Sequence, residues 1–166
     1  MFNLIDHNEA DIVCTLDSHI YDTNYIILNE ENIGVHFVAS ANNVLADKQS
    51  VSIENVLTQS FLLTEKGMSY RRILDEELAK KSLEVKPVLE MGSADILCKL
   101  VQDDVGISFL PDYVTQQAVE NGSIIKLDVK DFNINVWKQL IHHKDKWISP
   151  AMQVVIDSLS KITLSK

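Results

Sequence analysis

The sequence has few cysteines, prolines and glycines and no long hydrophobic run, and each shortage excludes a class of protein. Two cysteines among 166 residues, with no Cys-x-x-Cys pair, exclude a disulfide scaffold and give no zinc motif. Three prolines and five glycines exclude a collagen-like or low-complexity chain. No stretch reaches the roughly 18 apolar residues of a membrane span, and the first residues lack the pattern of a signal peptide. We therefore expect a cytoplasmic location and no membrane association.

Positive charge is also scarce. Fifteen Lys and Arg stand against 24 Asp and Glu, for a net charge of −9. Phosphate contacts require clustered basic side chains, so we expect no nucleic-acid binding by this chain alone. The apolar share of 46% and the charged share of 23% are typical of a globular protein. Cys14 and Cys98 each lie in an apolar run, which predicts two buried free thiols.

Strand patterns and helix patterns alternate along the chain, which favours an α/β architecture. Helices are predicted after the capping residues Ser52, Ser93 and Ser149, over residues 70–81, and from Pro111 to the Asn121-Gly122 stop. The last helix carries a core-facing stripe of Met152, Val155, Ile156, Leu159 and Ile162. Strands are predicted over residues 11–16, 25–28, 33–39, 60–63, 85–90, 105–110, 124–127 and 136–141.

Residues 90–111 are the most informative segment. Glu90-Met91-Gly92-Ser93 ends a strand and caps an amphipathic helix, and a buried strand over Val105–Leu110 follows and stops at Pro111. This order brings a strand's carboxyl end and a helix N-terminus to one sheet edge. In open α/β sheets, small ligands bind at such an edge.

In order and spacing, these segments resemble the effector-binding domain of LysR-type transcriptional regulators. The family's Asp-Ile strand is matched by Asp11-Ile12-Val13, and its Glu-x-Gly-Ser helix start by Glu90-Met91-Gly92-Ser93. Its Val-x-x-Gly-x-Gly-Ile-x-x-x-Pro turn is matched by residues 101–111, with Asp104 in place of the first glycine. If that position needs a positive φ, aspartate adopts it at modest cost. Further matches are residues 35–39, 44–46, 53–57 and 149–151.

The resemblance implies a two-lobed, periplasmic-binding-protein-like (type 2) α/β fold. Lobe I would comprise residues 1–39 plus 133–166, and lobe II residues 40–132. The family carries a DNA-binding winged helix-turn-helix and the first strand–helix–strand of lobe I before the Asp-Ile strand, and this sequence has no matching segment. We therefore expect an incomplete first lobe that is either rearranged or has its exposed sheet edge covered in a homodimer or homo-oligomer.

The resemblance also places a small-molecule site, with Thr15, Ser40, Thr64, Met91, Ser93 and Phe109 as its ligand-binding residues. Ser93 has the clearest physical basis, because a helix N-terminus and a hydroxyl can together hold an anion. A plain N-cap explains Ser93 equally well. Exposed strand ends are the alternative for Thr15 and Ser40, and ordinary loop chemistry for Thr64. The expected ligand is a small anionic effector, with no cofactor and no metal.

Side chains for catalysis are not grouped in the sequence. Five scattered histidines form no HExxH motif, and His142-His143 would point to opposite faces of a strand. We interpret Asp103-Asp104 as solvated turn acids, Arg71-Arg72 as surface charge, and the two tryptophans, Trp137 and Trp147, as packing residues of lobe I. We therefore expect no enzyme activity.

The leading hypothesis is an effector-sensing domain of a LysR-type regulator that lacks its DNA-binding part. Ligand capture between the lobes would shift the population of lobe or subunit arrangements. A solute-binding protein of a transport system is one alternative, and the lack of a signal peptide disfavours it. An enzyme on the same scaffold and a dimerising interaction fragment are the others.

Overall fold

The computed structural model describes residues 2–161 and separates them into two compact units. Unit 1 consists of the residues up to Ile33 and those from Val136, and unit 2 is Gly34–Asn135. The chain thus passes between the units at 33/34 and 135/136, near the lobe boundaries that the resemblance places at 39/40 and 132/133. Strand β2 (Tyr25–Ser40) contributes residues to both units.

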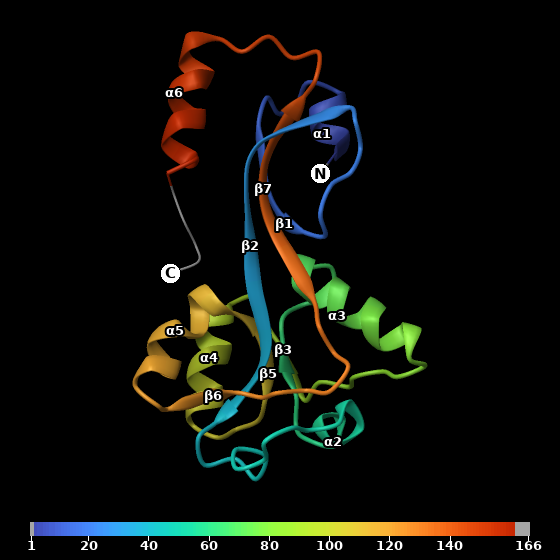
Figure 1. Cartoon of the computed structure of the whole chain (residues 1–166), viewed down its shortest axis with the longest axis vertical. Helices are drawn as coiled ribbons and strands as arrows, with labels where there is room; N and C mark the ends of the chain where they lie inside the picture. Colours follow the sequence, from blue (N-terminus) through green and yellow to red (C-terminus); the bar gives the residue numbers. More distant parts are fainter. Residues whose placement is uncertain (1, 162–166) are drawn as a thin grey trace. The chain divides into compact units, whose positions relative to one another are not determined.

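Unit 1 is built on three neighbouring strands. Strand β7 (Asn135–His143) lies between β1 (Val13–Asp17) and β2, and it runs antiparallel to β1 with Thr15 opposite Gln139. Helix α1 (Phe2–Asp6), which the sequence pattern did not predict, contributes Ile5 to a small core with Ile20 and Ile141. Helix α6 (Pro150–Leu159) completes the unit (Figure 1).

Unit 2 combines short strands with helices on both sides of them. Strand β3 (Leu62–Leu63) is parallel to β4 (Leu89–Glu90), and a parallel bridge from Phe61 to Ile107 connects it to the segment that leads into β5 (Ser108–Pro111). Strands β5 and β6 (Ile124–Lys126) pair antiparallel with β2. Figure 1 shows α4 and α5 on one side of these strands and α3 on the other. The helices are α2 (Ile53–Leu57), α3 (Ser69–Lys80), α4 (Ala94–Gln102) and α5 (Asp112–Glu120).

Capping chemistry sets the helix ends of unit 2. Ser52 and Ser93 accept backbone N–H bonds at the starts of α2 and α4, as predicted. Helix α4 ends in a Schellman motif, with Asp104 at φ 58° and bonds from Asp104 N to Val101 O and from Val105 N to Leu100 O. The position of the absent glycine therefore does require the left-handed region. Gly106 is needed for a different reason, because a Cβ there would lie 2.5 Å from the Ser60 carbonyl oxygen.

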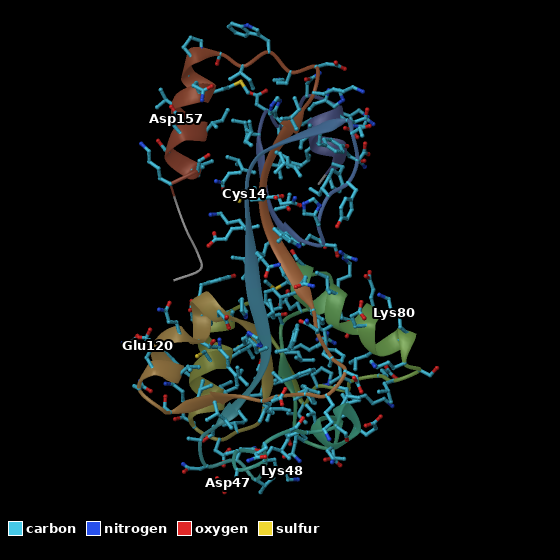
Figure 2. All side chains as sticks on the ribbon, in the orientation of Figure 1. Cys14, Asp47, Lys48, Lys80, Glu120 and Asp157 are labelled. Carbon is cyan, nitrogen blue, oxygen red and sulfur yellow. The ribbon has the colours of Figure 1, made fainter. Side chains whose placement is uncertain are left out.

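Four expectations about the fold are wrong or only partly met. The strands predicted over 25–28 and 33–39 form one 16-residue strand, β2, and the strand predicted over 85–90 is reduced to Leu89–Glu90. Cys14, labelled in Figure 2, is exposed rather than buried, because it lies on β1 with its side chain away from the core. The stripe of α6 is only partly buried: Ile156 is buried, Met152 and Leu159 are partly exposed, and Val155 is 49% exposed. Ile162 lies outside the described residues.

Within residues 2–161, no helix combines the length and the apolarity that crossing a membrane requires. The tryptophans have unequal surroundings. Trp137 is partly buried in β7 and stacks edge-on against His19, whereas Trp147 is 75% exposed.

Candidate functional site

The candidate site lies in unit 2, where its parallel strands end. Thr64 directly follows β3 and Met91 directly follows β4, and the Met91 N–H donates to the Leu63 carbonyl at 3.1 Å. Helices α3, α4 and α5 begin after β3, β4 and β5 respectively. We call the residues that follow these three strand ends the carboxyl edge. Ligands of open α/β folds bind at edges of this kind.

Backbone donors are available at the carboxyl edge because its helices are weakly capped. The Ser93 Oγ accepts from the Ile96 N–H at 3.4 Å, near the limit of a hydrogen bond. Among the described residues, the N-cap positions of α3 and α5, Met68 and Pro111, make no side-chain capping bond. The first N–H groups of a helix have no partner within that helix, and the helix dipole makes this end attractive to anions.

Neutral hydroxyl groups surround these helix starts. The Tyr70 ring is buried and its hydroxyl is hydrogen-bonded with the Thr64 side chain. Burial raises the pKa of Tyr70 to about 12, with Tyr113 and Asp95 adding to the rise and Thr64 opposing it. Burial, and then the charge of Asp95, also raise the pKa of Tyr113. Both phenols therefore keep their protons at neutral pH and can donate as well as accept hydrogen bonds.

Sequence reasoning missed both tyrosines. Tyr70 and Tyr113 each occupy the first turn of a helix that follows a strand of the parallel set. That position was the available signal, because the first turn of such a helix lies at the same edge as the strand end.

Arg71 corrects the interpretation of Arg71-Arg72 as surface charge. Its side chain is 1% exposed, and its guanidinium pairs with Asp75 and Glu90 at 3.0 Å each. It also donates to the Thr64 carbonyl at 2.8 Å. Arg72 is 42% exposed and pairs with Glu76. A single local pattern could not separate the two, because two partners of Arg71 come from outside its helix: Thr64 follows β3 and Glu90 ends β4.

Three of the six predicted ligand-binding residues lie at the carboxyl edge. Thr64 is buried there, and Met91 and Ser93 are partly exposed. The Met91 side chain packs on the core cluster that includes Leu97 and Val101. Ser93 holds the start of α4, as described above.

The other three lie elsewhere. Ser40 ends β2, which is antiparallel to β5, so it lies at the opposite edge of the strands of unit 2, and its Oγ accepts from the Asn42 N–H. Phe109 is 2% exposed and packs against Phe37 and Phe132, so it belongs to the core. Thr15 belongs to unit 1, on β1, where it is 3% exposed. Ser40 therefore does not lie beside Thr64, Met91 and Ser93, because an antiparallel strand ends at the other edge, and its role in ligand binding stays a prediction.

A polar cavity of about 720 Å³ lies elsewhere in unit 2. His36, Lys126 and the segment Leu127–Asn133 contribute to its lining. Asp112 forms an ion pair with Lys126 at 2.7 Å, and its carboxylate lies 3.4 Å from the Nε2 atom of His36, so both side chains already have a carboxylate neighbour. Across residues 2–161, no three His, Cys, Asp or Glu side chains are grouped as metal ligands.

Comparison with known proteins decides the family. The sequence matches the LysR substrate binding domain over residues 1–162. The chain belongs to this family. The match covers both units, and it includes the carboxyl edge of unit 2 and the β1 strand of unit 1.

Relatives and solved structures agree with this membership. The chain is similar to the HTH-type transcriptional regulator CbbR of Sinorhizobium medicae, with 28% identity over 91% of this chain and 52% of that protein. It is similar in fold to the CcmR regulatory domain of Synechocystis PCC6803 in complex with 2-PG, with a TM-score of 0.77, 22% identity, and coverage of 96% of this chain and 76% of that one. The effector binding domain of QuiR in complex with shikimate follows, with a TM-score of 0.74, 16% identity, and coverage of 96% and 74%.

The LysR substrate-binding domain seen here therefore has the mixed α/β, periplasmic-binding-protein-like type 2 fold that the resemblance implied. It is an effector-binding domain of the LysR type. The chain spans 35% to 52% of the length of the curated relatives it matches, and those relatives are transcriptional regulators rather than enzymes.

Proposed function

We propose that this LysR domain serves a transcriptional regulator by binding a small, anionic effector at the carboxyl edge of unit 2. The carrying observation is the convergence of three helix starts, two without a side-chain cap, on strand ends that also present hydroxyl groups. Backbone donors suit a carboxylate or phosphate, and neutral hydroxyls suit the uncharged oxygens of such a ligand. Shikimate, the ligand of QuiR, combines a carboxylate with hydroxyl groups.

The charged side chains around the carboxyl edge restrict the class of ligand that can bind there. Asp95 lies in the first turn of α4, and Glu65 contacts the position where a Gly92 side chain would begin, at 3.7 Å. These carboxylates disfavour a ligand with several negative charges close together. We therefore expect one anionic group per effector at this edge, with hydroxyl or carbonyl oxygens beside it.

Several parts of the proposal concern the whole protein. We propose that the whole protein is cytoplasmic, has no enzyme activity and forms a homo-oligomer. Light scattering would measure its oligomeric state. Exposed apolar side chains support self-association, since Val154 on α6 is 66% exposed. We retain Thr15 as a ligand-binding candidate of unit 1. The regulator relatives favour this function over a transport protein.

The test is a titration of the purified chain with 2-PG, with shikimate and with a set of small carboxylates and phosphates, followed by thermal unfolding. A ligand present at about 100 times its dissociation constant adds roughly 2.7 kcal/mol of stability. We expect at least one ligand to raise the melting temperature. Ser93→Ala should weaken its affinity about tenfold through loss of one hydrogen bond to an anion.

Ser52→Ala is the matched control, because Ser52 caps α2 in the same unit with the same geometry, at 3.3 Å from the Asn55 nitrogen. Both substitutions should cost about 1 kcal/mol of stability as lost N-caps. Ser52→Ala should leave the effector affinity unchanged. A folded chain that none of the ligands stabilises would contradict the proposal.

A further inference from the structure

The buried guanidinium of Arg71 makes contacts that extend beyond its own helix. Its Nε pairs with both oxygens of Asp75, one turn further along α3, at 3.0 and 3.1 Å. Its Nη1 donates to the Thr64 carbonyl at 2.8 Å and pairs with Glu90 at 3.0 Å. Thr64 follows β3 and Glu90 ends β4, so one side chain connects α3 to the ends of two parallel strands.

Tyr70, the residue before Arg71, contacts the side chain of Thr64. The Tyr70 hydroxyl is hydrogen-bonded with the Thr64 side chain, and the Tyr70 ring is 4% exposed. The first turn of α3 therefore fixes both the carbonyl and the hydroxyl of Thr64. A residue held at both groups presents a fixed geometry to whatever contacts the segment after it.

Glu90 leads directly into the other part of the candidate site. Met91, Gly92 and Ser93 are the next three residues, and Ser93 starts α4. The Met91 N–H bonds to the Leu63 carbonyl, one residue before Thr64. Through Glu90 and Thr64, Arg71 thus acts on two of the three segments of the carboxyl edge, residues 64–68 and 91–93.

Arginine is the side chain that this position demands. Its planar guanidinium offers five N–H donors in fixed directions, whereas a lysine ammonium is a point charge on a flexible stem. A cation that is 1% exposed also needs charged partners, because burial of an unpaired charge is very costly. Asp75 and Glu90 supply them, and each of these carboxylates is 38% exposed.

We propose that Arg71 is a positioning residue for effector binding, which fixes the spacing between the segments after β3 and β4 without touching the ligand. This inference rests on the function proposed above. Its side chain is 1% exposed, and its guanidinium is held by Asp75, Glu90 and the Thr64 carbonyl, so we assign its effect to these protein partners. The competing role is general stabilisation of unit 2, and the two roles differ in which amides they protect.

The experiment compares Arg71→Lys with Arg72→Lys. The two arginines are adjacent on α3 and each pairs with a carboxylate four residues on, but Arg72 is 42% exposed. Amide hydrogen exchange is followed by NMR at Met91, on the carboxyl edge, and at Leu62, whose N–H bonds to the Ile107 carbonyl in the core. In Arg71→Lys, we expect the Met91 amide to exchange about tenfold faster relative to Leu62, with both unchanged in Arg72→Lys.

Affinity is the second measurement, with 2-PG and shikimate as the probes. For a probe that binds the wild type, Arg71→Lys should raise the dissociation constant about tenfold, and Arg72→Lys should not. Equal acceleration at Met91 and Leu62, or unchanged protection and affinity, overturns the positioning role. A wild type that binds neither probe counts against the proposed function, and the exchange data then still decide the role of Arg71.

Glu90→Gln guards against an Arg71 variant that fails to fold. The amide keeps an acceptor oxygen for Arg71 but removes the charge, and Asp75 remains as a partner. The same selective loss of protection at Met91, smaller in size, supports the proposal. Full protection at Met91 in Glu90→Gln overturns it.

Discussion

The two free thiols of this chain lie in opposite environments. Cys98 is 6% exposed on α4, where its Sγ lies 3.7 Å from the Val114 carbonyl, whereas Cys14 is exposed on β1. Burial, and then the charge of Asp95, raise the pKa of Cys98. The thiolate is the reactive form, so a raised pKa lowers its fraction at any given pH, and burial limits access further.

We therefore expect N-ethylmaleimide to modify Cys14 well before Cys98 at pH 7.5, as followed by intact mass. Raising the pH should increase the rate at Cys98 up to its raised pKa, because more thiolate forms. Cys14→Ser is the control, since the fast phase should then vanish. If both thiols of the wild type were modified at the same rate, the environment of Cys98 would not be the one described.

The end of α4 shows how an element can depend on one backbone conformation. Asp104 adopts φ 58°, a region that costs most residues about 1–2 kcal/mol and costs glycine nothing. The equivalent position after α5 is Gly122, at φ 74°. The sequence at Asp104 therefore keeps the Schellman motif at an energetic cost.

Asp104→Gly should raise the free energy of unfolding by up to about 1 kcal/mol, measured by urea titration. Asp103→Gly is the adjacent control. Asp103 has an ordinary φ of −79°, so glycine should only add freedom to the unfolded chain and lower the stability. Equal losses in both variants would argue against a left-handed Asp104.

Features that depend on contacts within one element could be predicted from the sequence, whereas features that depend on residues distant in sequence could not. Ser52, Ser93 and Ser149 marked helix starts correctly, because an N-cap bonds to its own helix. The middle of β2 did not look like a strand, since it reads Asn29-Glu30-Glu31-Asn32. Its partners are distant in sequence: Glu30 accepts from His19 and from Gln139, and Glu31 pairs with Lys138.

The residues of the candidate site also divide into those that the sequence could predict and those that it could not. Ser93 was predictable from its cap signal and from the order of strand and helix around it. Arg71 was not, because its neighbours Arg72 and Asp75 fit an exposed helix face, and its partners Thr64 and Glu90 come from other elements. Thr64 and Met91, which the resemblance assigned to a ligand site, lie at this edge, whereas β2 carries Ser40 to the opposite one, and their roles in ligand binding stay predictions.

At the scale of the whole molecule, the two units differ in how they are assembled. Unit 2 is one continuous stretch, Gly34–Asn135, and holds most of the buried hydrophobic residues. Unit 1 is assembled from two distant stretches, and its helix α6 has Ile156 as its buried residue. Fewer buried apolar contacts mean a lower free energy for local opening.

Hydrogen exchange should therefore be faster in unit 1. We expect the amides of the β1–β7 pair, around Thr15 and Gln139, to exchange at least about tenfold faster than those of the β2–β5 pair, around Phe37 and Phe109. Peptide-level mass spectrometry resolves both regions. Identical protection in the two pairs would mean that the units open together.

Strand β2 has a consequence for how the family's sequences can vary in length. Its residues 25–33 belong to unit 1 and its residues 34–40 to unit 2. Side chains alternate along a strand, so one inserted or deleted residue would turn every side chain on one side of the change to the opposite face. Val35 and Phe37 are buried in unit 2, and Ile33 in unit 1, so either outcome would expose a core. Length changes among natural homologues of this domain should therefore collect in its loops, such as residues 41–51 and 81–88, and spare β2.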